Sequence, residues 1–323
     1  MIKKVVLLLL ATLSFTATHF ASAQTWPTRP LRIVVGFPPG GMADILPRRL
    51  QDALGTALGQ PVIVENKPGG AGVVGVLAIT QARDDHTIGI LTLQNLTYQA
   101  IEPKVPYDLR KDIQGVSVIA TVPYVLGIFA ESPIKTTEEF LRFAKANPGK
   151  LKLGTPGVAT GSQFVLELLK NGGGGLDIVH IPYKGMILAY NDVVGGHVDA
   201  TVGPLGSMRQ FLDAGKIRAL GIATVSRNPK MPNLPTLLES TGNRDLIFGD
   251  WYAVVAPSTM PEAALQKISK AIHDIMATKS FTDSAQAGGL ELMPTNPKET
   301  KAFLVKELDR VTEVLQRTGI KLE

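Results

Sequence analysis

Two glycine-rich loops are the parts of this sequence best suited to chemistry, and the chemistry that they suit is the binding of an anion. The first loop, FPPGGMAD at 37–44, follows an apolar run at 31–35 and leads into residues with helical spacing. The second, TPGVATGSQ at 155–163, has the same surroundings. A helix that starts directly after such a loop leaves backbone N–H groups unpaired and points its positive dipole end at the loop. Each loop can therefore bind a carboxylate without an arginine.

The first loop supplies five candidate binding residues, namely Phe37, Pro39, Gly40, Gly41 and Asp44. The two glycines permit positive φ and let a ligand approach the backbone closely. Asp44 is best explained as a cap of its own helix, because a carboxylate aimed into an anion site would repel the ligand. An ordinary strand–helix connection without a ligand explains the same residues, since a short glycine turn is a weak motif. The loop alone leaves both interpretations open.

The second loop adds hydroxyl groups to the same arrangement. Its candidate binding residues are Thr155, Thr160, Gly161, Ser162 and Gln163. The hydroxyl groups can donate hydrogen bonds to a carboxylate. Thr160 or Ser162 can equally serve only as the N-cap of the helix that follows, which is the commoner role of such residues.

Three further candidates follow other predicted strands. Gln94 comes after the strand predicted at 87–93, in a polar stretch that is alternatively only a surface loop. Tyr183 and Lys184 follow a later predicted strand. Because the carboxyl ends of parallel strands share one edge of a sheet, we expect these side chains near the glycine-rich loops. Lys184 can reach a ligand there, although a loop lysine is usually solvated.

No residue pattern in the sequence predicts catalysis. The chain has no cysteine, its histidines lack metal or triad spacing, and no G-x-S-x-G elbow is present. Gly70, Gly72 and Gly75 match G-x-G-x-x-G, but the next predicted strand ends in Gln94 and not in an acid for a ribose. We therefore attribute these glycines to helix packing. We expect no catalytic residue, no metal and no cofactor.

Residues 1–23 have the pattern of a secretory leader, with Lys3 and Lys4, an apolar run, and an Ala-Ser-Ala that ends at Ala23. We expect cleavage after Ala23 and an exported protein. No later run approaches the roughly 20 apolar residues that a membrane crossing needs. Removal of the two lysines lowers the formal charge from +5 to +3. The remaining basic residues are scattered, so no nucleic-acid partner is expected.

The elements that position the loops predict an α/β fold with two domains, which suits a mature chain of about 300 residues. The β-rich stretch from Val116 is too long for one strand and is interrupted by Pro123, so we place a domain crossing there. Prolines at 229–235 carry the chain back to a strand at 251–257. The expected domains are 24–122 with 227–323, and 123–226. Two connecting strands would form a hinge.

A series of segments along the whole mature chain resembles one known family. The segments include WPTRPLRIVVGFPPGGMADILPRRL, LGQPVIVENKPGGAGVVG, PYDLRKDI, VHIPYKG, AGKIRALGIAT, PNLPTL and WYAVVAP, in that order. Together they resemble the tripartite tricarboxylate transporter receptors, the TctC-like Bug (Bordetella uptake gene) family of periplasmic solute-binding proteins. The ordered series is far more specific than any single glycine motif.

The resemblance implies a type II periplasmic binding fold, with a mainly parallel sheet flanked by helices in each domain and the ligand in a cleft between them. The family's two binding loops match 37–44 and 155–163, and backbone amides and ordered water carry much of the binding. This chain departs from the family at Pro39 and in the second loop, at Pro156, Thr160 and Gln163. It also lacks an acid near Gly203, which argues against an α-amino ligand.

The function that the resemblance implies is that of a periplasmic receptor and not of an enzyme. We expect a monomer whose two domains close on the ligand, because two connecting strands permit hinge motion. The receptor would capture a di- or tricarboxylate or an aromatic carboxylate and deliver it to the membrane subunits of a tripartite tricarboxylate transporter. Two alternatives use the same cleft. One is an exported enzyme that acts on a small carboxylate, and the other is a sensor subunit that presents its ligand to a membrane kinase.

Overall fold

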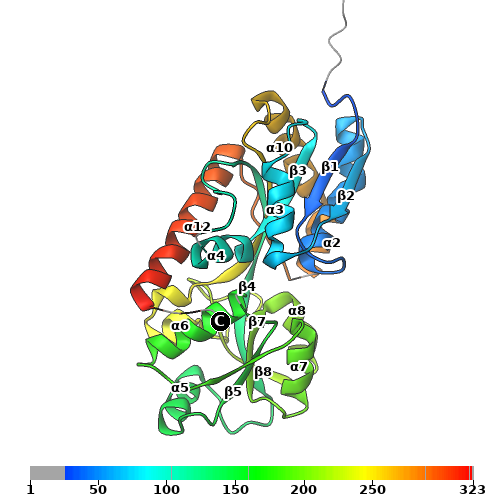
Figure 1. Cartoon of the computed structure of the whole chain (residues 1–323). Coiled ribbons are helices and arrows are strands. Elements are labelled where there is room, and N and C mark those ends of the chain that lie inside the picture. Colours follow the sequence, from blue (N-terminus) through cyan, green and yellow to red (C-terminus); the bar gives the residue numbers. More distant parts are fainter. Residues whose placement is uncertain (1–25, 103, 159, 288, 320, 322–323) are drawn as a thin grey trace, which may run out of the picture.

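The structure, a computed structural model, describes residues 26–102, 104–158, 160–287, 289–319 and 321. The predicted leader and its cleavage site lie outside these residues. The chain forms two lobes, one above the other, and strand β4 (Ile113–Phe129) runs through both (Figure 1). Within the described ranges, no helix is long and apolar enough to cross a membrane.

The first lobe is built on a sheet with the strand order β2-β1-β3-β9-β4. The strands β1 (Leu31–Val35), β2 (Val62–Asn66) and β3 (Thr87–Thr92) are parallel, whereas β9 (Gly249–Pro257) is antiparallel to β3 and to β4. The short strand β10 (Glu291–Leu292) pairs with β4. Helices cover both faces of β1 and β3, which explains why their sequences are nearly unbroken apolar runs.

Helices α2 (Met42–Leu58) and α10 (Glu262–Met276) pack together over one face of this sheet. The other face is covered by α3 (Val73–Thr80), α4 (Leu93–Ile101) and α12 (Pro297–Thr318). α2 begins at Met42, contains Pro47 within it, and ends at Gly59 in a left-handed C-cap. Two short elements complete the lobe, α11 (Lys279–Ala287) and the 3-10 turn η1 (Gly70–Gly72).

The second lobe continues the sheet in the order β4-β7-β5-β6, and β8 (Ile217–Ile222) also pairs with β4. The strands β5 (Lys152–Thr155), β6 (Val179–Pro182) and β7 (Ala200–Pro204) are parallel, and β7 is antiparallel to β4. The parallel strands of this lobe are therefore joined to those of the first lobe through β4 and β9.

The faces of the second sheet are again covered by helices. α5 (Thr137–Ala146) and α6 (Gly161–Gly172) pack on one face, and α7 (Met186–Val194) and α8 (Leu205–Asp213) pack on the other. This arrangement confirms the predicted two-lobed α/β fold.

β4 differs from the prediction of two strands separated at Pro123, because it is a single strand of 17 residues. Pro123 lies opposite Gly249, at the last pairing between β4 and β9. The next residue, Tyr124, already pairs with Pro204 of β7. Proline is tolerated here because the partner strand changes at this point, so the missing N–H does not interrupt a continuous ladder.

The segment before β9 packs on the second lobe. Helix α9 (Leu237–Thr241) contacts α5 and β8, and the 3-10 turn η2 (Arg244–Leu246) contacts α6. The predicted domain boundary at residue 227 lies ahead of these contacts. We therefore propose that the chain returns to the first domain near Gly249, while the first crossing stays near Pro123.

Candidate functional site

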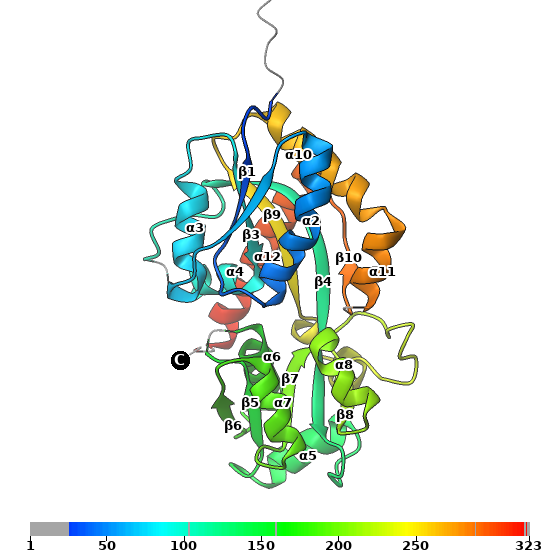
Figure 2. The same ribbon diagram turned by 90° about the vertical axis from the view of Figure 1, so that its right-hand side faces the viewer.

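The carboxyl ends of the parallel strands in both lobes meet the boundary between the lobes. In the first lobe, Thr92 at the end of β3 pairs with Tyr252 near the start of β9. In the second lobe, Pro204 at the end of β7 pairs with Tyr124 in the middle of β4. Figure 2 shows α2 above this boundary and α6 below it, and α4 contacts α6 across it. We call the residues where α2, α4, α6 and α7 begin, together with the loops before them, the interlobe site.

The carboxylate of Asp44 ties the first loop together. It accepts hydrogen bonds from the Gly40 N–H at 3.0 Å, from Arg48 Nε at 2.9 Å and from Asn66 Nδ2 at 2.8 Å. The bond from Arg48 is the main cause that lowers the pKa of Asp44 from 3.8 to about 2, against the effect of burial. The ionised carboxylate of Asp44 therefore holds the loop in place, and the charge of Arg48 balances its own. The N-cap of α2 is Gly41 and no side chain caps the helix, so the prediction that Asp44 caps its own helix was wrong. The carboxylate of Asp44 instead binds the N–H of Gly40, ahead of the helix.

The first loop still presents backbone donors. The N–H groups of Gly41, Met42 and Ala43 have no acceptor among the described residues, whereas those of Asp44 and Ile45 donate to the Gly41 carbonyl at 2.9 Å. These three N–H groups lie at the positive end of a helix of 17 residues. They are the part of this loop that can bind an anion.

The other first-loop candidates differ in their surroundings. Gly40 has a φ of 93°, so it needs glycine, whereas Gly41 has an ordinary φ of −82° and open space where a β-carbon would lie. Phe37 is half-buried against the core of the first lobe, and its carbonyl accepts a hydrogen bond from Asn66 Nδ2 at 3.0 Å. Pro39 is exposed.

Two hydroxyl groups of the second loop are engaged within their own lobe. Thr155 Oγ1 lies 2.6 Å from His180 Nε2 and donates to the Gly157 carbonyl at 3.1 Å. Thr160 is the N-cap of α6, since its Oγ1 accepts from the Gln163 N–H at 3.4 Å and donates to the Gly157 carbonyl at 2.8 Å. The alternative role of Thr160 as a cap is therefore the one that the structure supports.

The residues that begin α6 pack tightly. A β-carbon on Gly161 would come within 2.3 Å of the Tyr124 hydroxyl, so this position needs glycine. Ser162 and Gln163 are buried, and Ser162 Oγ lies 4.0 Å from Met186 Sδ. The N–H groups of Gly161 and Ser162 have no acceptor in the part of the chain that the structure describes. They face the boundary as the counterparts of the free N–H groups of α2.

The remaining candidates surround these two helix starts. Gln94 is half-buried in the first turn of α4. The polar stretch after β3, for which a surface loop was the alternative, is thus a helix that begins with a capping box of Thr92 and Asn95. Tyr183 donates its N–H to the Thr155 carbonyl at 2.9 Å and its hydroxyl to Asp192 at 2.6 Å, so its hydroxyl is occupied. Lys184 is exposed.

Two polar groups beside the site, Asp250 and Asn95, are not among the thirteen candidate residues. Asp250 at the start of β9 accepts a hydrogen bond from Tyr124. Asn95 is fully buried, and its Nδ2 has no partner among the described residues. Asn95 was noticeable as a polar residue after a buried strand, and Asp250 as an acid directly before WYAVVAP. Neither signal reveals the residue's partner in space.

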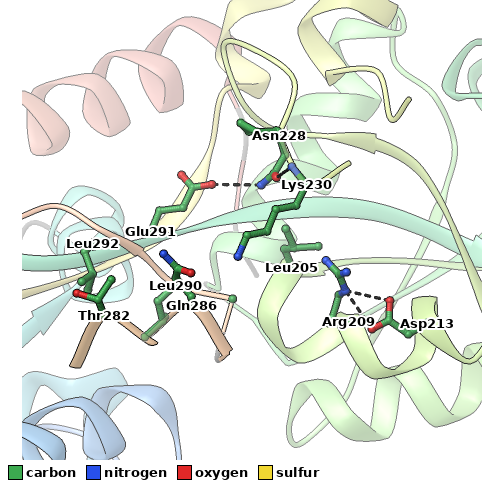
Figure 3. A pocket seen from close by; sticks show the side chains of 12 residues that line it. Leu205, Arg209, Asp213, Asn228, Lys230, Thr282, Gln286, Leu290, Glu291 and Leu292 are labelled. Atoms are coloured by element: carbon green, nitrogen blue, oxygen red, sulfur yellow. Dashed lines mark hydrogen bonds and ion pairs between the residues drawn. The ribbon is translucent and has the colours of Figure 1, made fainter. Parts of the chain in front are cut away.

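Two cavities between the lobes lie outside the glycine-rich loops. One, of about 680 Å³, lies between α8 of the second lobe and the segment around β10, and the hydrogen bond from Asn228 to Glu291 crosses it (Figure 3). The second, of about 840 Å³, lies beside the crossing strands and includes Asp250 and Arg310. The residues that line these cavities include none of the thirteen candidates predicted from the sequence. Within the described residues, no group of three His, Cys, Asp or Glu side chains could hold a metal ion.

Comparison with known proteins places the chain in a family. Residues 46–320 match the model of the tripartite tricarboxylate transporter family receptor. BugT of Bordetella pertussis is 29% identical over 305 residues, which cover 94% of this chain and 93% of BugT. The solved periplasmic binding protein BugD is 26% identical, with a TM-score of 0.79 and coverage of 92% of this chain and 99% of BugD. An R. palustris protein solved with adipate is 27% identical, with a TM-score of 0.80 and coverage of 91% and 99%. The chain belongs to the tripartite tricarboxylate transporter receptor family, as its sequence resemblance implied.

Proposed function

We propose that the protein is a periplasmic receptor that binds a small organic carboxylate in the interlobe site and delivers it to a tripartite tricarboxylate membrane transporter. One observation carries the proposal: α2 and α6 begin on opposite sides of one boundary, each with unpaired N–H groups at its start. Two such helix starts suit a ligand with two or more carboxylate oxygens to bind. The adipate bound to the R. palustris relative is a ligand of this kind.

The electrostatics of the first loop support this function. A negative charge at the start of α2 would repel a carboxylate, but the charge of Asp44 is balanced by Arg48 and by hydrogen bonds from Gly40 and Asn66. The amides of Gly41, Met42 and Ala43 are then the groups that a ligand meets. We propose that they, with the amides of Gly161 and Ser162, hold the ligand directly or through water.

Closure of the two lobes is part of the same proposal. The crossing strands β4 and β9 are last paired at Pro123 and Gly249. We propose that these two strands act as a hinge. Exposed apolar side chains flank the site, namely Val74 in the first lobe and Val158, Ile187 and Leu188 in the second. Closing the lobes on a ligand would bury part of this surface.

A thermal-shift screen of aliphatic, tricarboxylic and aromatic acids with the mature protein tests the receptor function. A ligand that binds only the folded state raises its stability by roughly 2.7 kcal/mol at a hundredfold excess over Kd. We expect at least one acid to give such a rise, and small-angle scattering to show a monomer that contracts when this acid is saturating. A screen without any stabilising acid would contradict the proposal, and turnover of an acid would favour the enzyme instead.

Delivery to a transporter needs a separate experiment. Immobilised protein, incubated with detergent-solubilised membranes of the source cell, should retain transporter subunits in a ligand-dependent manner. Retention of a membrane kinase instead would support the sensor alternative.

A further inference from the structure

Asp250 brings a carboxyl group from the first lobe to the boundary between the lobes, beside the interlobe site. It lies at the start of β9, opposite Val122 of β4. Two residues later, Tyr252 pairs with Thr92, where β3 ends and α4 begins. Asp250 is therefore at the edge of the sheet where the first lobe meets the second, and it is only half-buried.

Asp250 is next to the start of α6. Its carboxyl accepts a hydrogen bond from the hydroxyl of Tyr124. The same hydroxyl lies where a β-carbon on Gly161, the first residue of α6, would come within 2.3 Å. Tyr124 therefore connects Asp250 of the first lobe with Gly161, where the free N–H groups of the second lobe lie.

A second tyrosine of the other lobe, Tyr190 of α7, also interacts electrostatically with Asp250. The Tyr190 hydroxyl bonds to Ser207 Oγ at 2.9 Å, and it occupies the space beside Gly203, where a β-carbon would approach it to 2.4 Å. The place where an acid was expected for an amino-acid ligand is therefore filled by Tyr190, and the acid comes from β9 instead.

The charge of Asp250 has no cationic partner. The side chains that interact with it are Tyr124, Tyr190 and Tyr252. No arginine, lysine or histidine among the described residues pairs with it. Burial raises the pKa of Asp250 from 3.8 to about 6, and the hydrogen bond from Tyr124 opposes this only in part. At pH 7 the group is still mainly ionised, so it is an uncompensated negative charge next to a site for anions.

We propose that Asp250 determines ligand specificity, and that it selects acids that carry an amino or hydroxyl donor in addition to their carboxylates. This inference rests on the proposed carboxylate-receptor function. The free N–H groups of α2 and α6 bind the carboxylates, and the donor of the ligand satisfies Asp250. An acid without such a donor leaves Asp250 uncompensated and is repelled by it.

Calorimetric titration with two matched series tests the proposal. The first series is succinate, malate and aspartate, and the second is adipate, 2-hydroxyadipate and 2-aminoadipate. One charge-assisted hydrogen bond changes Kd by about ten- to hundredfold. We expect the mature protein at pH 7.5 to bind a hydroxy or amino acid at least about tenfold more tightly than the plain acid of the same length. The two substituted acids of each series distinguish a hydroxyl from an ammonium donor.

Asp250→Asn removes the charge with little change of shape and should reduce this preference to below about threefold, mainly through tighter binding of the plain acid. Asp250→Ser is a second variant for the case that the amide disturbs folding, and Asp213→Asn, an exposed acid at the end of α8, is a control that should keep the preference. Equal binding of plain and substituted acids by the unmodified protein overturns the proposal, as does an unchanged preference in both Asp250 variants. Binding of plain acids alone overturns it while leaving the receptor function intact, whereas absence of all binding overturns both.

Discussion

The hydroxyl of Tyr124 occupies the space that a side chain at Gly161 would need. A β-carbon on Gly161 would lie 2.3 Å from Tyr124 Oη and 2.9 Å from Tyr124 Cε2. Tyr124 belongs to the strand that crosses between the lobes, and Gly161 begins α6. The glycine of the second loop is therefore required by packing against the crossing strand, whatever ligand the loop binds.

Gly161→Ala should accordingly destabilise the ligand-free protein. The added methyl group forces Tyr124 or the start of α6 to move, and overpacking of this kind costs about 1–3 kcal/mol. Urea unfolding without ligand measures the effect. An unchanged free energy of unfolding would mean that Tyr124 moves freely and that the contact does not constrain the loop.

Gly41→Val should behave in the opposite way. Gly41 has an ordinary φ of −82° and open space at the position of a β-carbon, so the free energy of unfolding should fall by no more than about 1 kcal/mol, the cost of valine at an N-cap. The valine side chain stands beside the free N–H groups of α2 and should weaken ligand binding at least about tenfold by calorimetry. Ala57→Val, exposed at the far end of the same helix, is the control. Undiminished binding by Gly41→Val would remove the first loop from the site.

Local sequence signals were sufficient to predict the main elements of the fold. The buried β-branched run at Leu31–Val35 and the helical spacing after Gly41 each depend on residues close in sequence, and the structure confirms both. The continuity of β4 through Pro123 was not predictable in this way, because it depends on a change of partner strand at Gly249. The capping box that begins α4 was missed because a polar stretch is equally typical of a loop.

Local sequence signals predict the site less completely than they predict the fold. The two loops were identified from their glycines, but which hydroxyl groups are already occupied depends on distant partners such as His180 for Thr155. The hydrogen bond between Tyr124 and Asp250 joins residues of two strands far apart in the chain. Contacts of this kind follow from the topology, so a single sequence does not contain a local signal for them. That the thirteen candidates bind the ligand stays a prediction.

Lys184→Met should weaken ligand binding only slightly, by less than about threefold. The Lys184 side chain is exposed, and the proposed binding groups are backbone N–H groups, so its charge acts through solvent. Calorimetric titration with the acid identified in the screen measures the change. Arg48→Met is an informative comparison, because it leaves the carboxylate of Asp44 without its cation at the start of α2 and should weaken binding more. Loss of binding in Lys184→Met would show that an ion pair holds the ligand.

Asp44→Asn should destabilise the protein at neutral pH. The variant loses the charge that accepts hydrogen bonds from Gly40, Arg48 and Asn66. A carboxyl whose pKa falls from 3.8 to about 2 on folding contributes about 2.5 kcal/mol at most, and exposure of Arg48 reduces this to about 1–2 kcal/mol. Urea unfolding at pH 7 measures the difference, and Asp52→Asn, an exposed acid on the same helix, should change the stability by less than about 0.5 kcal/mol.

The contribution of Asp44 should also disappear in acid. Because the folded-state pKa of Asp44 lies below the unfolded value of 3.8, the unfolded chain binds this proton more tightly, and protonation favours unfolding. The stabilisation is thus complete above about pH 5 and falls as the pH approaches 2. The free energies of unfolding of the unmodified protein and of Asp44→Asn should therefore approach each other progressively from pH 5 to pH 2, with about half of the difference lost at pH 3, which urea titrations at several pH values can follow. A difference that stays constant over this range would show that Asp44 stabilises the loop through its shape and not through its charge.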